Sequence, residues 1–166
     1  MSDITHVRHK PPTSLEQPRE LIVACPPMRS NVNLSRIIRA ASCSGVGRIV
    51  CCGTAKVIDK IARDGVGGIE IDRHRTLPAV LRRLRTDGYR IVGLEQTSQS
   101  ECLFDYPFER RTALVIGNER QGLTEELLAE LDTAVEIPVY GPPHSHNAAT
   151  AAAIAIYEYC RQFPAG

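Results

Sequence analysis

ELIVACPPMRSNVNLSRIIRAASCSGVGRIVCC, residues 20–52, places one longer amphipathic segment between two short apolar runs. The runs Glu20–Cys25 and Gly47–Cys52 have the length of buried strands, and Pro26 ends the first of them. Between them, Asn33–Gly45 has apolar residues at helical spacing and ends at a glycine, so we predict a helix. The order strand, helix, strand is typical of a parallel sheet covered by helices.

The same alternation continues along the rest of the chain. The further predicted strands are Gly68–Ile71, Tyr89–Glu95, Arg111–Gly117 and Ala134–Ile137, and the further predicted helices are Ala55–Arg63, Leu77–Thr86, Thr124–Leu131 and Asn147–Gln162. Because the strand runs are apolar throughout, we predict an α/β domain with a mostly parallel sheet and helices on both faces. Residues 1–19 are polar and contain three prolines, which predicts a flexible tail before a single domain over residues 20–166.

Composition narrows the class of protein. The chain has 166 residues, 43% of them apolar and 23% charged, as expected of one soluble globular domain. Apolar runs stay well below the roughly 20 residues of a membrane helix, and the first residues lack the apolar core of a signal peptide. We therefore expect a cytoplasmic protein. The six cysteines form no CxxC pair, which favours buried free thiols over a zinc site.

The distribution of positive charge leaves two interpretations open. A net charge of +1 argues against a protein that grips nucleic acid over a wide basic surface. Six arginines and one histidine nevertheless fall within the eighteen residues from Arg73 to Arg90. This cluster fits a solvated helix face or a group of phosphate contacts.

Ligands of such folds bind in the loops beyond the carboxyl ends of the strands. In the first of these loops, Asn33 opens the predicted helix as its cap, and Arg39 follows nearly two turns later. An arginine on a helix that is otherwise apolar and small can point back to the loop as a functional group. It can equally extend its charged end to solvent.

Two later loops carry further polar groups. Gly117 and Gly122 bracket a turn of Asn118, Glu119, Arg120 and Gln121, which matches neither of the common glycine-rich phosphate loops. This turn could bind a ligand or be an ordinary polar loop. The last loop leads through Ser145–Asn147 into an alanine-rich helix, and capping explains part of that pattern. His144 and His146 have no third ligand nearby, so we expect no metal site.

Taken in order, the three loops resemble those of one family. NLSRIIRAASCSGV, IGNERQGL and IPVYGPPHSHNAATAAAIAIYE resemble the three motifs of the SpoU-type (TrmH-like) RNA 2′-O-ribose methyltransferases of the SPOUT superfamily, in their minimal single-domain form. The resemblance covers roughly residues 20–161. Two positions depart from the family pattern, since His146 stands where leucine is usual and Ala40 where threonine is common.

The resemblance implies a fold and an activity. The expected fold has a trefoil knot in its C-terminal part, and the expected protein is a homodimer with its first and last helices near the interface. It would transfer a methyl group from S-adenosylmethionine to a ribose 2′-hydroxyl of RNA, with transfer RNA expected ahead of ribosomal RNA. Arg39 would hold a phosphate and stabilise the developing alkoxide, because a guanidinium is a poor base.

The resemblance also assigns residues. Its catalytic positions correspond here to Arg39, Asn33, Glu119, Ser145 and Asn147. Its cofactor-binding positions correspond to Leu94, Glu95, Gly117, Asn118, Ile137, Ser145, His146 and Asn147. For RNA binding we expect contributions from Arg29, Arg36, Arg82 and Arg83.

Two rival hypotheses remain beside this one. The first is a module of the same fold that binds RNA or a nucleotide but has lost methyl transfer. The second is an α/β domain for some other nucleotide or metabolite, for which the three motifs would be chance.

Overall fold

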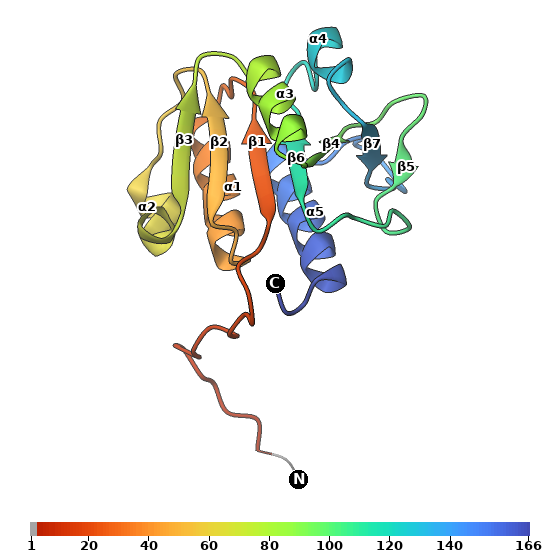
Figure 1. Cartoon of the computed structure of the whole chain (residues 1–166). Helices are drawn as coiled ribbons and strands as arrows, with labels where there is room; N and C mark the ends of the chain where they lie inside the picture. The colour runs from red at the N-terminus through yellow and green to blue at the C-terminus, as the bar shows by residue number, and fades with distance from the viewer. Residues whose placement is uncertain (1–2) are drawn as a thin grey trace.

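The computed structural model describes residues 3–166 and has a seven-stranded sheet at its centre (Figure 1). All pairings are parallel, in the order β3-β2-β1-β6-β4-β7-β5. The strands are β1 (Leu21–Cys25), β2 (Arg48–Cys52), β3 (Glu70–His74), β4 (Arg90–Leu94), β5 (Glu101–Cys102), β6 (Thr112–Ile116) and β7 (Thr133–Glu136). The predicted parallel sheet is therefore confirmed.

Helices cover both faces of this sheet. They are α1 (Asn31–Cys43), α2 (Asp59–Ala62), α3 (Pro78–Thr86), α4 (Glu125–Leu128) and α5 (Ala148–Gln162), with a 3₁₀ turn at Arg63–Gly68. The core has two parts, one on each face of the sheet, because successive strand residues point to opposite faces. Val23 and Ile49 pack with α1, α2 and α5, whereas Ile22 and Val50 pack with α3 and α4. Figure 1 shows α3 in front of the sheet and α1 and α5 behind it.

Several predicted boundaries are wrong for local reasons. Helix α1 begins at Asn31, because the Ser30 hydroxyl rather than Asn33 caps it, accepting the Asn33 N–H at 3.1 Å. Helices α2 and α4 are each four residues long. The backbone of Arg63 reverses to a φ of 53°, which ends α2. The sequence did not predict the two-residue strand β5, which is defined by its pairing with β7.

The segment just before β1 contacts the C-terminal residues below the sheet (Figure 1). Arg19 donates to the carbonyl oxygens of Ser44 and Phe163, at 2.6 and 2.5 Å. The N–H groups of Glu16 and Gln17 donate to the carbonyl of Ala165. The last residues before β1 are thus attached to the ends of α1 and α5.

All six cysteines are free, but they are not all buried as the sequence predicted. Cys25, Cys51 and Cys52 lie in the core, whereas Cys102 and Cys160 are half-buried. Cys43, the last residue of α1, is exposed. Over residues 3–166, no helix is long and apolar enough to cross a membrane.

Candidate functional site

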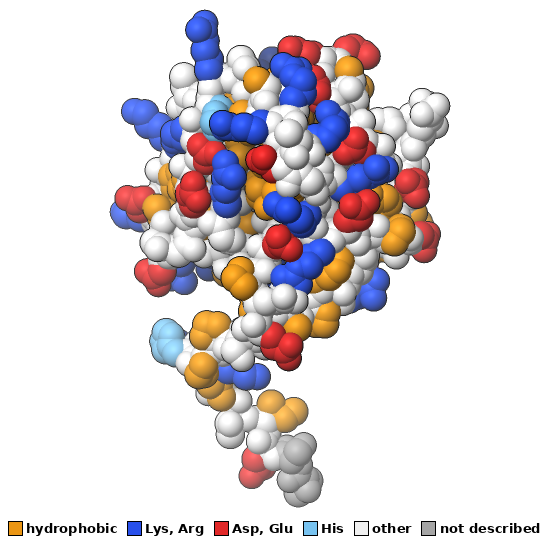
Figure 2. All heavy atoms as spheres, in the orientation of Figure 1, with side chains coloured by type: hydrophobic (Ala, Val, Ile, Leu, Met, Phe, Trp, Pro, Cys, Tyr) orange, Lys and Arg blue, Asp and Glu red, His pale blue; other side chains and the backbone are white. Residues whose placement is uncertain are grey.

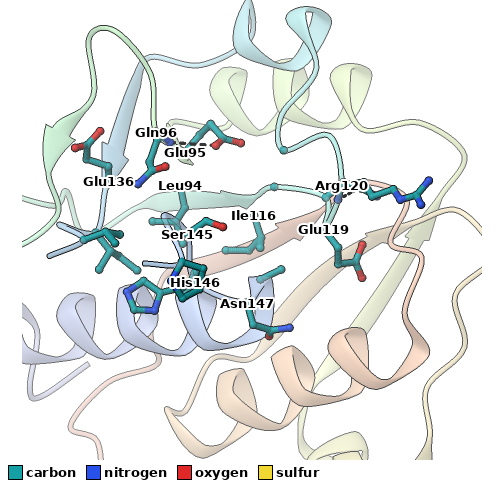
Figure 3. Close-up of a pocket in the computed structure, with 18 residues that line it drawn as sticks. Leu94, Glu95, Gln96, Ile116, Glu119, Arg120, Glu136, Ser145, His146 and Asn147 are labelled. Atoms are coloured by element: carbon teal, nitrogen blue, oxygen red, sulfur yellow. Dashed lines mark hydrogen bonds between the residues drawn. The ribbon is translucent and has the colours of Figure 1, made fainter. Parts of the chain in front are cut away.

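A cavity of about 490 Å³ opens beyond the carboxyl ends of β4, β6 and β7 (Figure 3). Parallel α/β sheets bind their ligands at this edge. Three segments form its wall: the residues after β4, the loop after β6, and the loop from β7 into α5. The lining residues are Leu94, Glu95, Gln96, Ile116, Gly117, Asn118, Glu119, Arg120, Gly122, Glu136, Ile137, Val139, Pro143, Ser145, His146, Asn147, Ala148 and Ala151.

Glu95 and two glycines determine the shape of the loop after β6. The Glu95 carboxylate accepts the N–H of Leu123 at 2.8 Å and that of Gln96 at 3.1 Å. A Cβ added at Gly122 would lie 2.1 Å from Glu95 Oε2, and the backbone there has a φ of 62°. A Cβ at Gly117 would lie 3.1 Å from the Gly122 Cα. Only glycine therefore lets this loop fold tightly over the carboxylate.

Asn118 closes the same loop and ties it to the loop after β1. Its backbone exchanges two hydrogen bonds with Gly122, both at 3.0 Å. Its side-chain oxygen accepts the Arg120 N–H at 2.9 Å, which is the turn geometry expected of asparagine. Its amide nitrogen donates to the Pro27 carbonyl at 2.6 Å. The two loops are thus held at a fixed separation.

Glu119 is directed at the start of α1. Its carboxylate accepts the N–H groups of Arg29 at 3.1 Å and Ser30 at 3.0 Å, and the side-chain amide of Asn33 at 3.2 Å. Burial alone would raise the pKa of Glu119, but the hydrogen bonds from its own N–H and from these three donors outweigh burial and lower that pKa. Glu119 is therefore a carboxylate at neutral pH, placed at the positive end of a helix.

A hydrogen-bonded chain runs from Glu119 through Asn33 to Asn147. Asn33 donates to Glu119, and its side-chain oxygen accepts from the amide nitrogen of Asn147 at 3.2 Å. The Asn147 oxygen in turn accepts the N–H groups of Ala149 and Thr150, which caps α5. This relay, Glu119–Asn33–Asn147, joins the three loops that carry the motifs, and each donor and acceptor in it has a partner.

The charges around the cavity are unbalanced. Three carboxylates line it, those of Glu95, Glu119 and Glu136, against one guanidinium, that of Arg120. No ion pair within residues 3–166 includes any of these three carboxylates. Figure 3 shows the Arg120 guanidinium directed away from the other labelled side chains. The cavity is therefore an acidic environment, suited to a ligand with positive charge.

The structure brings most of the predicted site residues together. All eight predicted cofactor-binding residues line the cavity, from Leu94 to Asn147. Of the five predicted catalytic residues, Glu119, Ser145 and Asn147 line it, and Asn33 joins them through the relay. Arg39 does not line it. This arginine is exposed on the outer side of α1, and no hydrogen bond joins it to Glu119 in the part of the chain that the structure describes.

The predicted RNA-binding arginines fall into two groups. Arg29 and Arg36 are exposed beside and along α1. Arg82 and Arg83 are on α3, on the opposite face of the sheet, and Arg82 pairs with Glu130. Figure 2 shows that the basic side chains of this second face are interspersed with acidic ones.

The sequence analysis missed some residues of the site. Ser30, Asn31 and Asn33 are all residue types that cap helices, so the sequence does not show which of them does so. The hydrogen bond to the Ser30 hydroxyl identifies Ser30 as the cap. Gln96, Glu136 and Val139 also line the cavity. They lie at or just after strand ends, where both polar and apolar residues are common, so their residue types do not indicate a site. Their one available signal was position, since each follows or ends a strand whose carboxyl end opens on the cavity.

Known proteins resemble this chain in sequence and fold over most of its length. The profile of the SpoU rRNA Methylase family matches residues 20–157. This chain belongs to the SpoU methylase family. It is 28% identical to the tRNA (guanosine(18)-2′-O)-methyltransferase of Escherichia coli over 133 residues, which cover 78% of this chain and 58% of that protein. The chain thus spans less than two thirds of that relative's length.

Solved structures of SpoU proteins have the same fold. The TrmH/SpoU tRNA modifying enzyme of Aquifex aeolicus superposes with a TM-score of 0.84 at 26% identity, covering 90% of this chain and 78% of that one. The SpoU methyltransferase AviRb of Streptomyces viridochromogenes, in complex with the cofactor AdoMet, superposes with a TM-score of 0.73 at 25% identity, covering 88% and 58%. The cavity described above therefore lies in the fold of a methyltransferase family.

Proposed function

We propose that this protein transfers a methyl group from S-adenosylmethionine to a ribose 2′-hydroxyl of RNA, with transfer RNA as the expected substrate. The observation that carries the proposal is that the second and third family motifs line one acidic cavity and that the relay joins the first motif to them through Asn33. The names of the relatives support the activity, since the Escherichia coli protein is a tRNA methyltransferase and AviRb is a SpoU methyltransferase in complex with AdoMet.

The residues of the cavity fit this cofactor. A volume of about 490 Å³ is within the usual range of small-molecule sites. Leu94, Ile116 and Ile137 give an apolar wall suited to a purine ring. Glu136 has one carboxylate oxygen bonded to the Ser100 hydroxyl, which leaves the other for a ligand. The unpaired carboxylates suit a ligand with a sulfonium and an ammonium group.

Bound S-adenosylmethionine would supply a methyl group that is already reactive toward an oxygen nucleophile. The protein then has to fix the acceptor ribose in line with that methyl group, and positioning of this kind can supply several kcal/mol of the barrier. The relay holds the three loops in fixed positions relative to one another, which this positioning requires. Ser145 and Asn147, at the start of α5, are placed to contact the ribose or the cofactor carboxylate.

We retain Arg39 as the residue that holds a phosphate of the RNA and stabilises the developing alkoxide. Its guanidinium is exposed, and no carboxylate pairs with it among residues 3–166. An unpaired guanidinium is available to an incoming phosphate. Since Arg39 is outside the cavity wall, the RNA has to extend from the cavity mouth across the outer side of α1.

We further propose a homodimer. Helices α1 and α5 pack side by side, and their outer sides expose Val32 and Tyr157 to 36% and 51%. Apolar groups on two adjacent helices support an interface there. A second copy would place two sets of exposed arginines on one assembly, which offsets the small net charge of each chain. Light scattering on the purified protein tests the oligomeric state.

The trefoil knot and the cytoplasmic location also remain proposals. The knot is supported by the way the loop after β6 and the segment from β7 into α5 close on one cavity. Stretching the protein from its two termini tests it, because a knotted chain ends shorter than its full contour length. The six free thiols support a reducing compartment.

The rival hypothesis of an inactive binding module keeps one observation in its favour, namely that Arg39 does not line the cavity. The decisive experiment is methyl transfer from labelled S-adenosylmethionine to total cellular RNA, with wild type beside Arg39→Ala. We expect label as 2′-O-methylribose that is lost in the variant. Cofactor binding without transfer would favour the inactive module or a missing RNA or partner. No cofactor binding would overturn the proposed function.

A further inference from the structure

The loop from β7 into α5 exposes an aromatic ring that the relay and the cavity wall do not use. Tyr140 is 95% exposed, compared with 51% for Tyr157 and 48% for Phe104. The aromatic pairs of residues 3–166 join Tyr106, Phe108, Tyr159 and Phe163, and none includes Tyr140. Both faces of the Tyr140 ring are therefore available to a ligand.

The position of this ring relates it to the cavity. Val139, immediately before it, and Pro143, three residues after it, both line the cavity wall. The loop that carries Tyr140 therefore borders the cavity, and because Tyr140 is exposed and is not itself a lining residue, we take its ring to lie at the cavity mouth. Pro138, Pro142 and Pro143 each fix one backbone angle of the loop, which reduces the freedom that binding would have to remove. Tyrosine adds two rotatable side-chain bonds, a small entropic cost for so large a contact surface.

A second group at the mouth suits the same ligand. Arg120 lines the cavity from the loop after β6, is exposed, and directs its guanidinium away from the other labelled side chains (Figure 3). A guanidinium of this kind matches a backbone phosphate, whereas an exposed aromatic ring matches a base. The interior of the cavity is acidic and repels phosphate. A nucleotide strand is thus favoured at the mouth and excluded from the interior.

We propose that Tyr140 stacks on the base of the nucleotide whose ribose is methylated. This inference rests on the proposed function and adds the residue that holds the acceptor base. If the methyl donor is bound in the cavity, the acceptor ribose lies at the mouth, and its base is within reach of the mouth residues. Proteins recognise unpaired RNA bases by stacking them on aromatic side chains. Stacking uses the face of the ring, so the tyrosine hydroxyl is dispensable.

The test compares Tyr140→Ala and Tyr140→Phe with wild type in steady-state methylation of transfer RNA, with cofactor affinity measured separately by calorimetry. We expect Tyr140→Ala to raise the KM for RNA about tenfold, given the usual strength of base stacking. Tyr140→Phe should stay within about twofold of wild type, because the aromatic face is kept. Both variants should bind S-adenosylmethionine as wild type does. Phe104→Ala, an exposed aromatic outside the cavity wall, is the matched control and should change neither value.

Each outcome decides between the two proposals. A Tyr140→Ala protein with wild-type KM for RNA and normal methyl transfer would overturn the stacking role and leave the proposed function intact. A Tyr140→Phe protein as impaired as Tyr140→Ala would also overturn it, since the hydroxyl would then be the group that matters. A wild-type protein that binds no cofactor would overturn the proposed function, and the stacking role with it.

Discussion

Two polar regions of this protein look alike in sequence and differ in structure. Both the cavity edge and helix α3 are rich in charged side chains. At the cavity edge, Glu119 accepts two backbone N–H groups and the Asn33 amide, and Asn33 accepts from Asn147, which connects three loops. On α3, Arg82 and Arg85 pair with Glu130, and Arg85 also reaches Asp132 at 3.1 Å. The first region holds loops in place, and the second mainly balances its own charge.

The comparison shows why a cluster of charges in the sequence is a weak guide to a site. Ion pairs between partly exposed side chains stabilise a fold by at most about 1 kcal/mol each. Hydrogen bonds that connect distant loops instead fix the geometry on which chemistry depends. Asp72 on β3 is a further example of local charge balance, because Arg48 and His74 both pair with it. The hydrogen bond from Arg48, followed by that from His74, lowers the pKa of this carboxyl. The predictions below test this division between the two regions.

The largest effect should follow from cutting the relay. Asn147→Asp keeps the side-chain oxygen that caps α5 but removes the N–H that Asn147 donates to Asn33. We expect about a hundredfold lower kcat/KM for methyl transfer, because small displacements of a catalytic group cost that much. Thermal unfolding should show a Tm close to wild type, since the cap remains. Asn147→Ala should lower both activity and Tm, because it also loses a cap worth about 1 kcal/mol.

The next effect concerns the tight loop over Glu95. Gly122→Ala places a methyl group 2.1 Å from Glu95 Oε2 at a backbone φ of 62°, so the loop has to move. We expect unfolding in urea to show a loss of about 1–3 kcal/mol, together with weaker cofactor binding. Gly141→Ala is the matched control, since nothing lies within 4 Å of its Cβ position. Equal stabilities for the two variants would contradict the role assigned to Glu95.

Acid should weaken the relay in a predictable direction. The pKa of Glu119 is lowered in the folded protein, from an ordinary value of 4.5, so its contribution to stability is complete above that value and is lost as the pH falls through the folded pKa. Glu119→Gln should therefore be less stable than wild type at neutral pH, by about 1–3 kcal/mol. The difference should shrink below about pH 4.5. Urea unfolding over a pH series measures it, and a difference that is constant with pH would contradict this assignment.

The smallest effects should come from α3. Arg83 is exposed, and no carboxylate pairs with it in residues 3–166, whereas Arg82 pairs with Glu130. If Arg83 contacts a phosphate, Arg83→Ala should weaken RNA binding a few-fold. It should also reduce the slope of log affinity against log salt concentration by about one. Arg82→Ala should have less effect on RNA binding. Filter binding at several salt concentrations measures both affinities. A loss of RNA affinity as large as the roughly hundredfold loss of kcat/KM expected from cutting the relay, in either variant, would contradict the contrast between the regions.

The sequence was sufficient to predict most of the fold and part of the site. Buried strands such as β1 and β6 are continuous apolar runs, and α1 and α3 have clear helical spacing, so local patterns define them. The relay was beyond such patterns, because its hydrogen bonds join residues 86 and 114 positions apart. The position of Arg39 outside the cavity wall likewise depends on how α1 packs in the folded protein, which local patterns do not determine.

The central claim is that the cavity beyond β4, β6 and β7 binds S-adenosylmethionine, and calorimetry with a variant that fills the cavity tests it most directly. Ala151 lines the cavity, whereas Ala153, on the same helix, does not. We expect wild type and Ala153→Leu to bind the cofactor equally, and Ala151→Leu to bind at least about tenfold more weakly with its fold intact by thermal unfolding. Equal binding by Ala151→Leu and wild type, or no binding by wild type, would contradict the claim.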